Sequence, residues 1–130
     1  LACPDFPTCQ TQWWPPIADF HEGFVMWRGV GIDYEGGVLD NPARVAIHFT
    51  HRIGAIATFF VLSVLGWLMF RRPWLRFDGL GLLTTLLAQV ILGISIVLYG
   101  APLAVAVAHN GVGALLLIMV LNANQRIRNS

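Results

Sequence analysis

Three long apolar stretches constrain what this chain can fold into. No charged residue occurs between Arg52 and Arg71, and none occurs between Asp78 and Arg126. A helix rises about 1.5 Å per residue, so roughly 20 apolar residues cross a hydrocarbon core of about 30 Å. The pattern predicts an all-α integral membrane fold, with three transmembrane helices that form most of a four-helix bundle. The predicted spans cover residues 42–70, 79–99 and 102–122, to within a few positions.

Composition divides the chain into a polar beginning and an apolar remainder. The chain is 56% hydrophobic and 12% charged, which is too apolar for a water-soluble domain of 130 residues. We expect residues 1–41 to form an extracytoplasmic loop and residues 42–130 to form a transmembrane helical domain. All basic residues are scattered arginines, so the sequence lacks the basic patch that nucleic-acid binding needs. The acidic residues of the first part are Asp5, Asp19, Glu22, Asp33, Glu35 and Asp40.

The arginines predict how the chain is oriented. Arg71, Arg72 and Arg76 follow the first span, and two more follow the third, so both clusters lie on the same side of a three-helix layout. The positive-inside rule assigns that side to the cytoplasm. The N-terminal loop is then extracytoplasmic and the C-terminus cytoplasmic, in a multi-pass protein of the bacterial inner (plasma) membrane. Tryptophans suit two interfacial belts, with Trp13, Trp14 and Trp27 outside and Trp67 and Trp74 inside.

The chain has two cysteines, Cys3 and Cys9, in a short segment that contains two prolines. Such a segment is typical of a small disulfide loop in an oxidising compartment. A bridge there would stabilise the loop by roughly 2 kcal/mol on chain-entropy grounds. A free pair of thiols, or half of a metal site, is the alternative.

Residues 15–39 are predicted to lie on the membrane surface. Apolar residues recur there at roughly helical spacing, which indicates a short interfacial helix, and glycines then break regular structure. Leu1 opens directly onto the cysteine segment without the features of a signal peptide. Because a polar segment of this length must be placed outside, we expect a helix upstream and a longer parent protein. The apolar residues are Ile17, Phe20, Phe24, Val25 and Trp27.

Three histidines inside the predicted spans carry the chemical argument. Ionisable residues are rare in transmembrane helices and mark functional sites. His51 and His48 lie about 13 Å and 9 Å from the start of the first span, and His109 lies about 10 Å from the start of the third. Two neutral imidazoles at matched depth can take the two axial positions of a haem iron. We therefore expect His51 and His109 to bind haem iron.

Alternatives for these side chains stay open. Depth does not choose between His48 and His51, so His48 is either the ligand or a neighbour that supports it. Arg52 is expected to pair with a haem propionate, or else to neutralise a buried acid or extend to the surface. Each histidine could instead bond a backbone carbonyl or a helix neighbour.

Small residues near the histidines would leave room for a haem ring on the ligand face. Polar residues in the second and third spans, Gln89 and Asn110, are interpreted as partners in hydrogen bonds between helices. The small residues are Gly54, Ala55, Ala106 and Gly113.

Three motifs in a fixed order resemble the haem A synthase (heme A synthase) family. The similarity covers nearly the whole chain, and the His51-Arg52 pair is its most specific mark. The first motif is Ala-Cys-Pro-Asp-Phe-Pro-Thr-Cys at 2–9 with Gln-Trp-Trp-Pro at 12–15. The second is Ala-Ile-His-Phe-Thr-His-Arg at 46–52, and the third is Val-Ala-His-Asn at 107–110 with Gly-Ala-Leu-Leu at 113–116.

The resemblance implies a specific role. That family has two four-helix halves, and this chain is similar to the C-terminal half without its first helix. By resemblance, His51 and His109 ligate the iron of a b-type haem (haem b), and Cys3 and Cys9 form a disulfide. The family's oxidoreductase converts the C8 methyl group of haem O to the formyl group of haem A, in the biosynthesis of the cytochrome oxidase cofactor. The implied partners are the N-terminal half of the same synthase, haem O synthase and the lipid bilayer.

Catalysis by this chain alone is not expected. A haem held by two histidines has no open position for oxygen, so it suits electron relay or structural support. Thr50 precedes His51, where the first His-Arg motif of the family follows an acid, and no catalytic residue is identified. The alternative functions are a small bis-histidine b-type cytochrome for membrane electron transfer and a structural membrane protein without haem.

Overall fold

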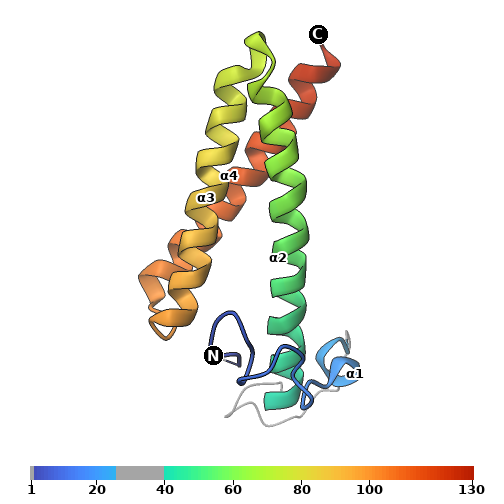
Figure 1. Ribbon diagram of the computed structural model, residues 1–130, viewed down its shortest axis with the longest axis vertical. Helices are drawn as coiled ribbons and strands as arrows, with labels where there is room; N and C mark the ends of the chain where they lie inside the picture. Colours follow the sequence, from blue (N-terminus) through green and yellow to red (C-terminus); the bar gives the residue numbers. More distant parts are fainter. Residues whose placement is uncertain (1, 26–39) are drawn as a thin grey trace, which may run out of the picture. The chain divides into compact units, whose positions relative to one another are not determined.

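The computed structural model describes residues 2–25 and 40–130, and these contain helices and no strand (Figure 1). Three helical segments are long and apolar enough to cross a membrane, which confirms the predicted fold class. The chain divides into two compact units, Leu1–Ala55 and Ile56–Ser130, and each is described by itself. The elements are α1 (Phe20–Gly23), α2 (Asn41–Phe70), the 3-10 turn η1 (Pro73–Leu75), α3 (Arg76–Leu98) and α4 (Leu103–Arg128).

The start of α2 follows from its cap. The Asp40 carboxylate accepts a hydrogen bond from the backbone N–H of Ala43 at 3.0 Å, and its carbonyl accepts one from Arg44 at 3.1 Å. An acidic cap satisfies N–H groups that have no partner within the helix. Pro42 lies in the first turn, where no N–H is needed. Asp40 is therefore the N-terminal cap of α2.

The N-terminal unit contains one short helix, α1. The Asp19 side chain accepts a hydrogen bond from the backbone N–H of Glu22 at 2.9 Å, which caps it. The Asp19 backbone donates to the Pro42 carbonyl at 3.1 Å, so this segment lies against the start of α2. Trp27 and the later glycines of the predicted surface segment, Gly29, Gly31, Gly36 and Gly37, fall outside the described residues.

The second long helix begins before its predicted start, and the third continues past its predicted end. Helix α3 begins at Arg76, so Asp78 lies in its first turn, where the helix dipole favours an acid. Helix α4 continues to Arg128, and its last turn carries two arginines, which the same dipole favours. Arg126 forms an ion pair with Asp78, which places the end of α4 beside the start of α3. Polar residues can extend a helix past the hydrocarbon core, which apolar runs alone do not predict.

The turn between α3 and α4 reverses the chain, and the two helices run antiparallel (Figure 1). Gly100 and Ala101 both have positive φ, at 70° and 59°. Glycine adopts this conformation at little cost. The Ala101 N–H bonds the Ile96 carbonyl at 2.7 Å, which ends α3 in a closed C-terminal turn.

The second unit packs around a small apolar core, and most of its apolar side chains face outward. In the most apolar stretch of each span, only 11%, 17% and 6% of the residues are buried within the chain. Apolar surface on this scale needs an apolar surrounding, as a bilayer or neighbouring helices provide. The buried core residues are Met69, Leu75, Leu82, Leu86, Leu116 and Ala123.

Helices α2 and α3 approach closely at two glycines. A Cβ atom added to Gly79 would lie 2.4 Å from the Phe70 nitrogen and 2.7 Å from the Gly66 carbonyl oxygen. A Cβ at Gly66 would lie 2.8 Å from the Leu83 side chain. Small residues of this kind let helix backbones pack in lipid, where no hydrophobic force drives association. The hairpin of α2 and α3 therefore depends on glycine at Gly79.

We predict that Gly79→Ala destabilises the protein by about 1–3 kcal/mol, because the added methyl group meets backbone atoms that must move apart. Thermal unfolding in detergent, followed by circular dichroism, measures this. Gly111→Ala is the matched control, since a Cβ there would meet no described atom within 4 Å. Equal melting temperatures for the two variants would contradict the close approach.

Candidate functional site

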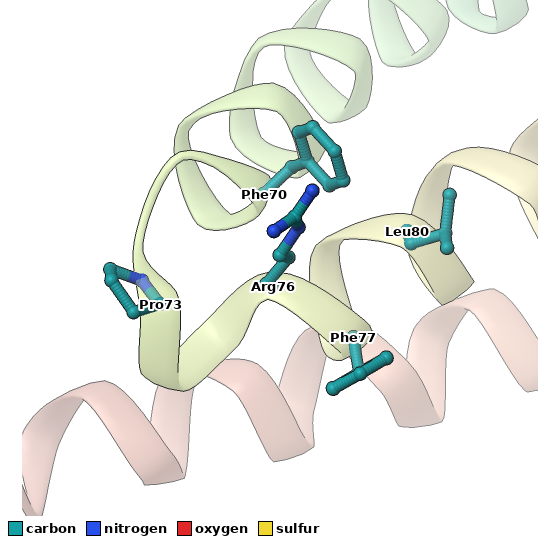
Figure 2. Close-up of a pocket in the computed structure, with 5 residues that line it drawn as sticks. All are labelled: Phe70, Pro73, Arg76, Phe77 and Leu80. Carbon is teal, nitrogen blue, oxygen red and sulfur yellow. The ribbon is translucent and has the colours of Figure 1, made fainter.

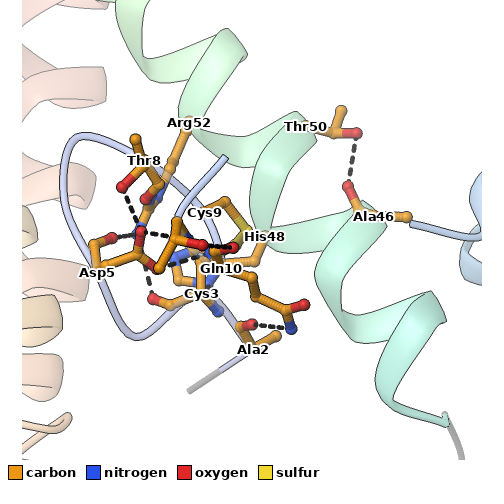
Figure 3. Close-up of a disulfide and its surroundings, with 11 residues drawn as sticks. Ala2, Cys3, Asp5, Thr8, Cys9, Gln10, Ala46, His48, Thr50 and Arg52 are labelled. Atoms are coloured by element: carbon orange, nitrogen blue, oxygen red, sulfur yellow. Dashed lines mark hydrogen bonds between the residues drawn. A yellow bond between two sulfur atoms is a disulfide. The ribbon is translucent and has the colours of Figure 1, made fainter. Parts of the chain in front are cut away.

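The cysteine segment covers one face of the first three turns of α2 (Figure 3). Val45, Phe49 and Arg52 lie four and three residues apart, which places them on one side of a helix. Val45 is fully buried against Cys3 and Cys9, and Phe49 packs on the same cluster. The structure joins the two cysteines through their sulfur atoms, with their Cα atoms 4.7 Å apart. We call residues 3–9 the Cys loop.

Two polar side chains of α2 bind the Cys loop backbone (Figure 3). The Cys3 N–H donates to Nδ1 of His48 at 3.2 Å. The Arg52 guanidinium donates to the carbonyl oxygens of Thr8 at 2.7 Å, Asp5 at 2.8 Å and Cys3 at 3.2 Å. Nη2 of Arg52 thereby donates two hydrogen bonds to the loop and Nη1 donates one. Arg52 thus connects three points of the loop to one turn of the helix.

The hydrogen bond to His48 bears on the choice of ligand that spacing left open. A neutral imidazole that accepts at Nδ1 carries its proton on Nε2. Neither nitrogen then presents a lone pair to a metal ion. The contact therefore favours His51 over His48 as the ligand-bearing histidine of α2. Arg52, expected to pair with a propionate, donates to loop carbonyls in this structure.

Asp5 organises the far side of the Cys loop. Its carboxylate accepts hydrogen bonds from the Thr8 hydroxyl, from the Gln10 N–H at 2.6 Å and from the Thr11 N–H at 2.9 Å. Gln10 and Thr11 have positive φ, at 54° and 65°, so the carboxylate bonds a tight turn. The Thr8 hydrogen bond, helped by the two backbone bonds, holds the pKa of Asp5 below its ordinary value of 3.8 against the opposing effect of desolvation.

The lowered pKa of Asp5 predicts how the loop responds to acid. Because the folded-state pKa is below the unfolded one, Asp5 stabilises the loop above pH 3.8, and this contribution is lost as pH falls through the folded-state value. Thr8→Val removes the largest cause and should raise the pKa of Asp5. Carboxyl NMR titration of the solubilised protein measures both values. A Thr8→Val titration that overlays the wild type would refute the assignment.

In the second unit, the His109 side chain of α4 packs against α3 at Gly93. A Cβ atom at Gly93 would stand 3.1 Å from Cε1 of the half-buried His109 ring. Nε2 of His109 is 3.4 Å from Nε2 of Gln89, one helical turn before Gly93. The predicted role of Gln89 in a hydrogen bond between helices is confirmed. Gly93 was missed, although a lone glycine four residues after a polar residue in an apolar span is a usable signal.

Gly113 makes room for a different group from the one predicted. A Cβ there would lie 3.1 Å from Nε2 of Gln89, so the Gln89 amide occupies the space beside this glycine. Oε1 of Gln89 is buried and has no hydrogen-bond partner among the described residues. A buried oxygen without a hydrogen bond lowers the stability of the folded protein by about 1–3 kcal/mol, because its desolvation is not compensated. A polar site with incomplete hydrogen bonding therefore lies beside His109, inside an apolar helix pair.

His51 lies on the exposed surface of α2 in the first unit. A Cβ atom at Gly54, three residues further on, would meet no described atom within 4 Å, so the helix surface beside His51 is open. Each imidazole by itself suits ligation of a haem, because the His51 ring is exposed beside open surface and the His109 ring is seated on a glycine. His51 and His109 belong to different units, and their predicted pairing across one gap stays a prediction.

Other candidate sites offer less chemistry. Among residues 2–25 and 40–130, no three His, Cys, Asp or Glu side chains gather as metal ligands, and a haem held by two imidazoles needs no such group. An open hollow lies at the turn from α2 into α3 (Figure 2), where the Arg76 guanidinium stands 5.0 Å from the Phe70 ring centre. A cation on an aromatic ring suits a membrane interface. The residues lining the hollow are Phe70, Pro73, Arg76, Phe77 and Leu80.

Comparison with known proteins covers nearly all of this chain. Residues 1–121 match the family described as cytochrome oxidase assembly protein, COX15-CtaA. Heme A synthase of Shewanella oneidensis is 41% identical over 124 residues, which are 95% of this chain and 37% of that protein. Heme A synthase of Roseobacter denitrificans is 32% identical over 123 residues, 92% of this chain and 28% of that protein. The chain thus spans about a third of the length of these relatives, and no solved structure matches it significantly.

Proposed function

Because the chain belongs to the cytochrome oxidase assembly protein family, COX15-CtaA, we propose that it is the haem b-binding, C-terminal half of a haem A synthase. The observation that carries the proposal is the His109 imidazole, seated on Gly93 inside an apolar helix pair. The names of the relatives support the biosynthetic role over a simple electron carrier. The whole synthase would oxidise the C8 methyl group of haem O to the formyl group of haem A.

His51 and His109 are the proposed iron ligands, and they would come from α2 and α4. When bound, a haem with two histidine ligands supplies one-electron transfer and leaves oxygen chemistry to another site. His109 is positioned by Gly93, and its Nε2 is held by the Gln89 amide. Ligation of iron through Nε2 would require the hydrogen bond between the Gln89 amide and this nitrogen to break.

The proposal includes a location and partners. Both arginine clusters would face the cytoplasm by the positive-inside rule, and the Cys loop would face the oxidising side of the plasma membrane, where its disulfide persists. The Arg126–Asp78 pair supports a common side for the two clusters. The proposed partners are the N-terminal half of the synthase, haem O synthase as the source of haem O, and the lipid bilayer.

Replacing His109 tests the ligand assignment. We expect the intact protein, purified from membranes, to show a low-spin haem spectrum, and we expect His109→Ala or His51→Ala to abolish it because an axial ligand is lost. His21→Gln is the matched control, since His21 lies in α1 and is exposed. Visible and paramagnetic resonance spectroscopy measure the change. An unchanged low-spin spectrum in His109→Ala would reject the assignment.

Filling the space at Gly93 tests the position of the ring without removing a ligand. A side chain there meets the imidazole, since even a Cβ atom would stand 3.1 Å from Cε1. We expect Gly93→Leu to reduce low-spin haem at least tenfold, because a displaced imidazole ligates poorly. Gly111→Leu, at open surface on α4, should retain the haem. Equal haem content in both variants, from pyridine haemochrome assay, would contradict the role of Gly93.

A further inference from the structure

The contacts between the Cys loop and α2 carry an inference beyond haem ligation. We propose that the Cys loop is a redox-sensitive lock on α2. While the disulfide is closed, the lock keeps His48 and Arg52 bound to the loop and leaves His51 as the histidine that presents its ring. Opening the disulfide releases both side chains. Only the statement about His51 rests on the proposed function, and the lock itself is tested separately.

The first support is the convergence of three loop carbonyls on one guanidinium. The oxygens of Cys3, Asp5 and Thr8 all accept from Arg52, and the Cys3 N–H donates to His48 (Figure 3). Hydrogen bonds from a charged donor are stronger than neutral ones. Three oxygens from one loop converge only if the loop keeps a fixed path. The disulfide restricts that path by removing chain freedom.

The second support is the burial of the disulfide. Cys3 is 0% exposed and Cys9 is 1% exposed, and both pack on the fully buried Val45. A reductant in water reaches the sulfur atoms only after the loop leaves α2. Docking of the loop and closure of the disulfide therefore stabilise each other, and thermodynamic linkage makes the effect equal in both directions. Arg52 protects the disulfide to the same extent that the disulfide holds Arg52.

The third support is the direction of His51. Successive residues of a helix are turned by about 100°, so His51 projects to one side of the face that Arg52 and His48 present to the loop. His51 is exposed, whereas His48 and Arg52 are partly covered. Within little more than one helical turn, two polar side chains therefore bind the loop and a third is directed elsewhere. His48 and Arg52 are positioning residues, because they fix the Cys loop on the helix face beside His51.

The redox step balances with a dithiol as reductant. One thiolate of the dithiol attacks a sulfur of the Cys3–Cys9 disulfide and forms a mixed disulfide, and the second thiolate closes the reagent to a cyclic disulfide. Two electrons pass to the protein, and two protons complete the thiols of Cys3 and Cys9. The freed guanidinium of Arg52 then lies next to His51 in sequence and can pair with a carboxylate.

The lock is tested by measuring the redox equilibrium of the disulfide in the intact protein. The solubilised protein is equilibrated in mixtures of reduced and oxidised dithiothreitol, thiols are trapped with a maleimide, and the mass shift gives the reduced fraction. The quantity measured is the ratio of reduced to oxidised dithiothreitol at which half of the protein has its disulfide open. We expect Arg52→Gln to lower this ratio about tenfold, because charged hydrogen bonds that favour the closed loop are lost. Arg52→Lys should restore part of this shift, since lysine keeps a charged donor.

Two controls separate the outcomes. Arg71→Gln removes an exposed arginine from the turn after α2 and should leave the ratio unchanged. An Arg52→Gln ratio equal to that of the wild type would overturn the lock. His109→Ala tests haem binding alone, so loss of the haem spectrum with an unchanged trapping ratio supports both proposals. A wild type without haem, together with a shifted Arg52→Gln ratio, supports the lock and refutes the proposed function.

Discussion

The fold depends on the rule that polar groups in hydrocarbon must be satisfied within the protein. No water is available there, so the backbone of each span closes its own hydrogen bonds as a helix. Serine and threonine side chains follow the same rule, since Ser95 and Thr84 donate to carbonyls one turn earlier. An imidazole or carboxamide in such a helix needs a partner on a neighbouring helix. This requirement brings Gln89 to His109 and makes their glycine neighbours necessary.

The two units solve the problem of a polar group near lipid in different ways. In the second unit, small residues open space between helices, and polar side chains enter it. In the first unit, a segment outside the span folds back and offers its own backbone to the helix. Arg52 can therefore lie near hydrocarbon with its charge compensated by carbonyl dipoles. Both solutions fix a histidine-bearing turn.

Much of the fold could be predicted from the sequence, and less of the site. Charge-free apolar runs and the Asp40 cap predict helices because length and capping are local properties. The continuation of α4 to Arg128 could not be read this way, since it rests on an ion pair with Asp78, far along the chain. The histidines were found from their rarity in spans, but the contacts of His48 and the place of Gly93 depend on which helix faces meet. Their depth in the spans and the family resemblance both indicated His51 and His109 as ligands, and their pairing stays a prediction.

The sparse burial within the three spans has a consequence for assembly. Only 6% of the most apolar stretch of α4 is buried within the chain. A helix surface left open to this extent gains its remaining packing from whatever else occupies the bilayer. The stability of the fold then depends on how many complementary helices share the same area of membrane. It rises with their number, as the stability of a soluble protein rises with the concentration of a ligand that binds its folded state. Diluting the protein with lipid should loosen it even where temperature and pH stay constant.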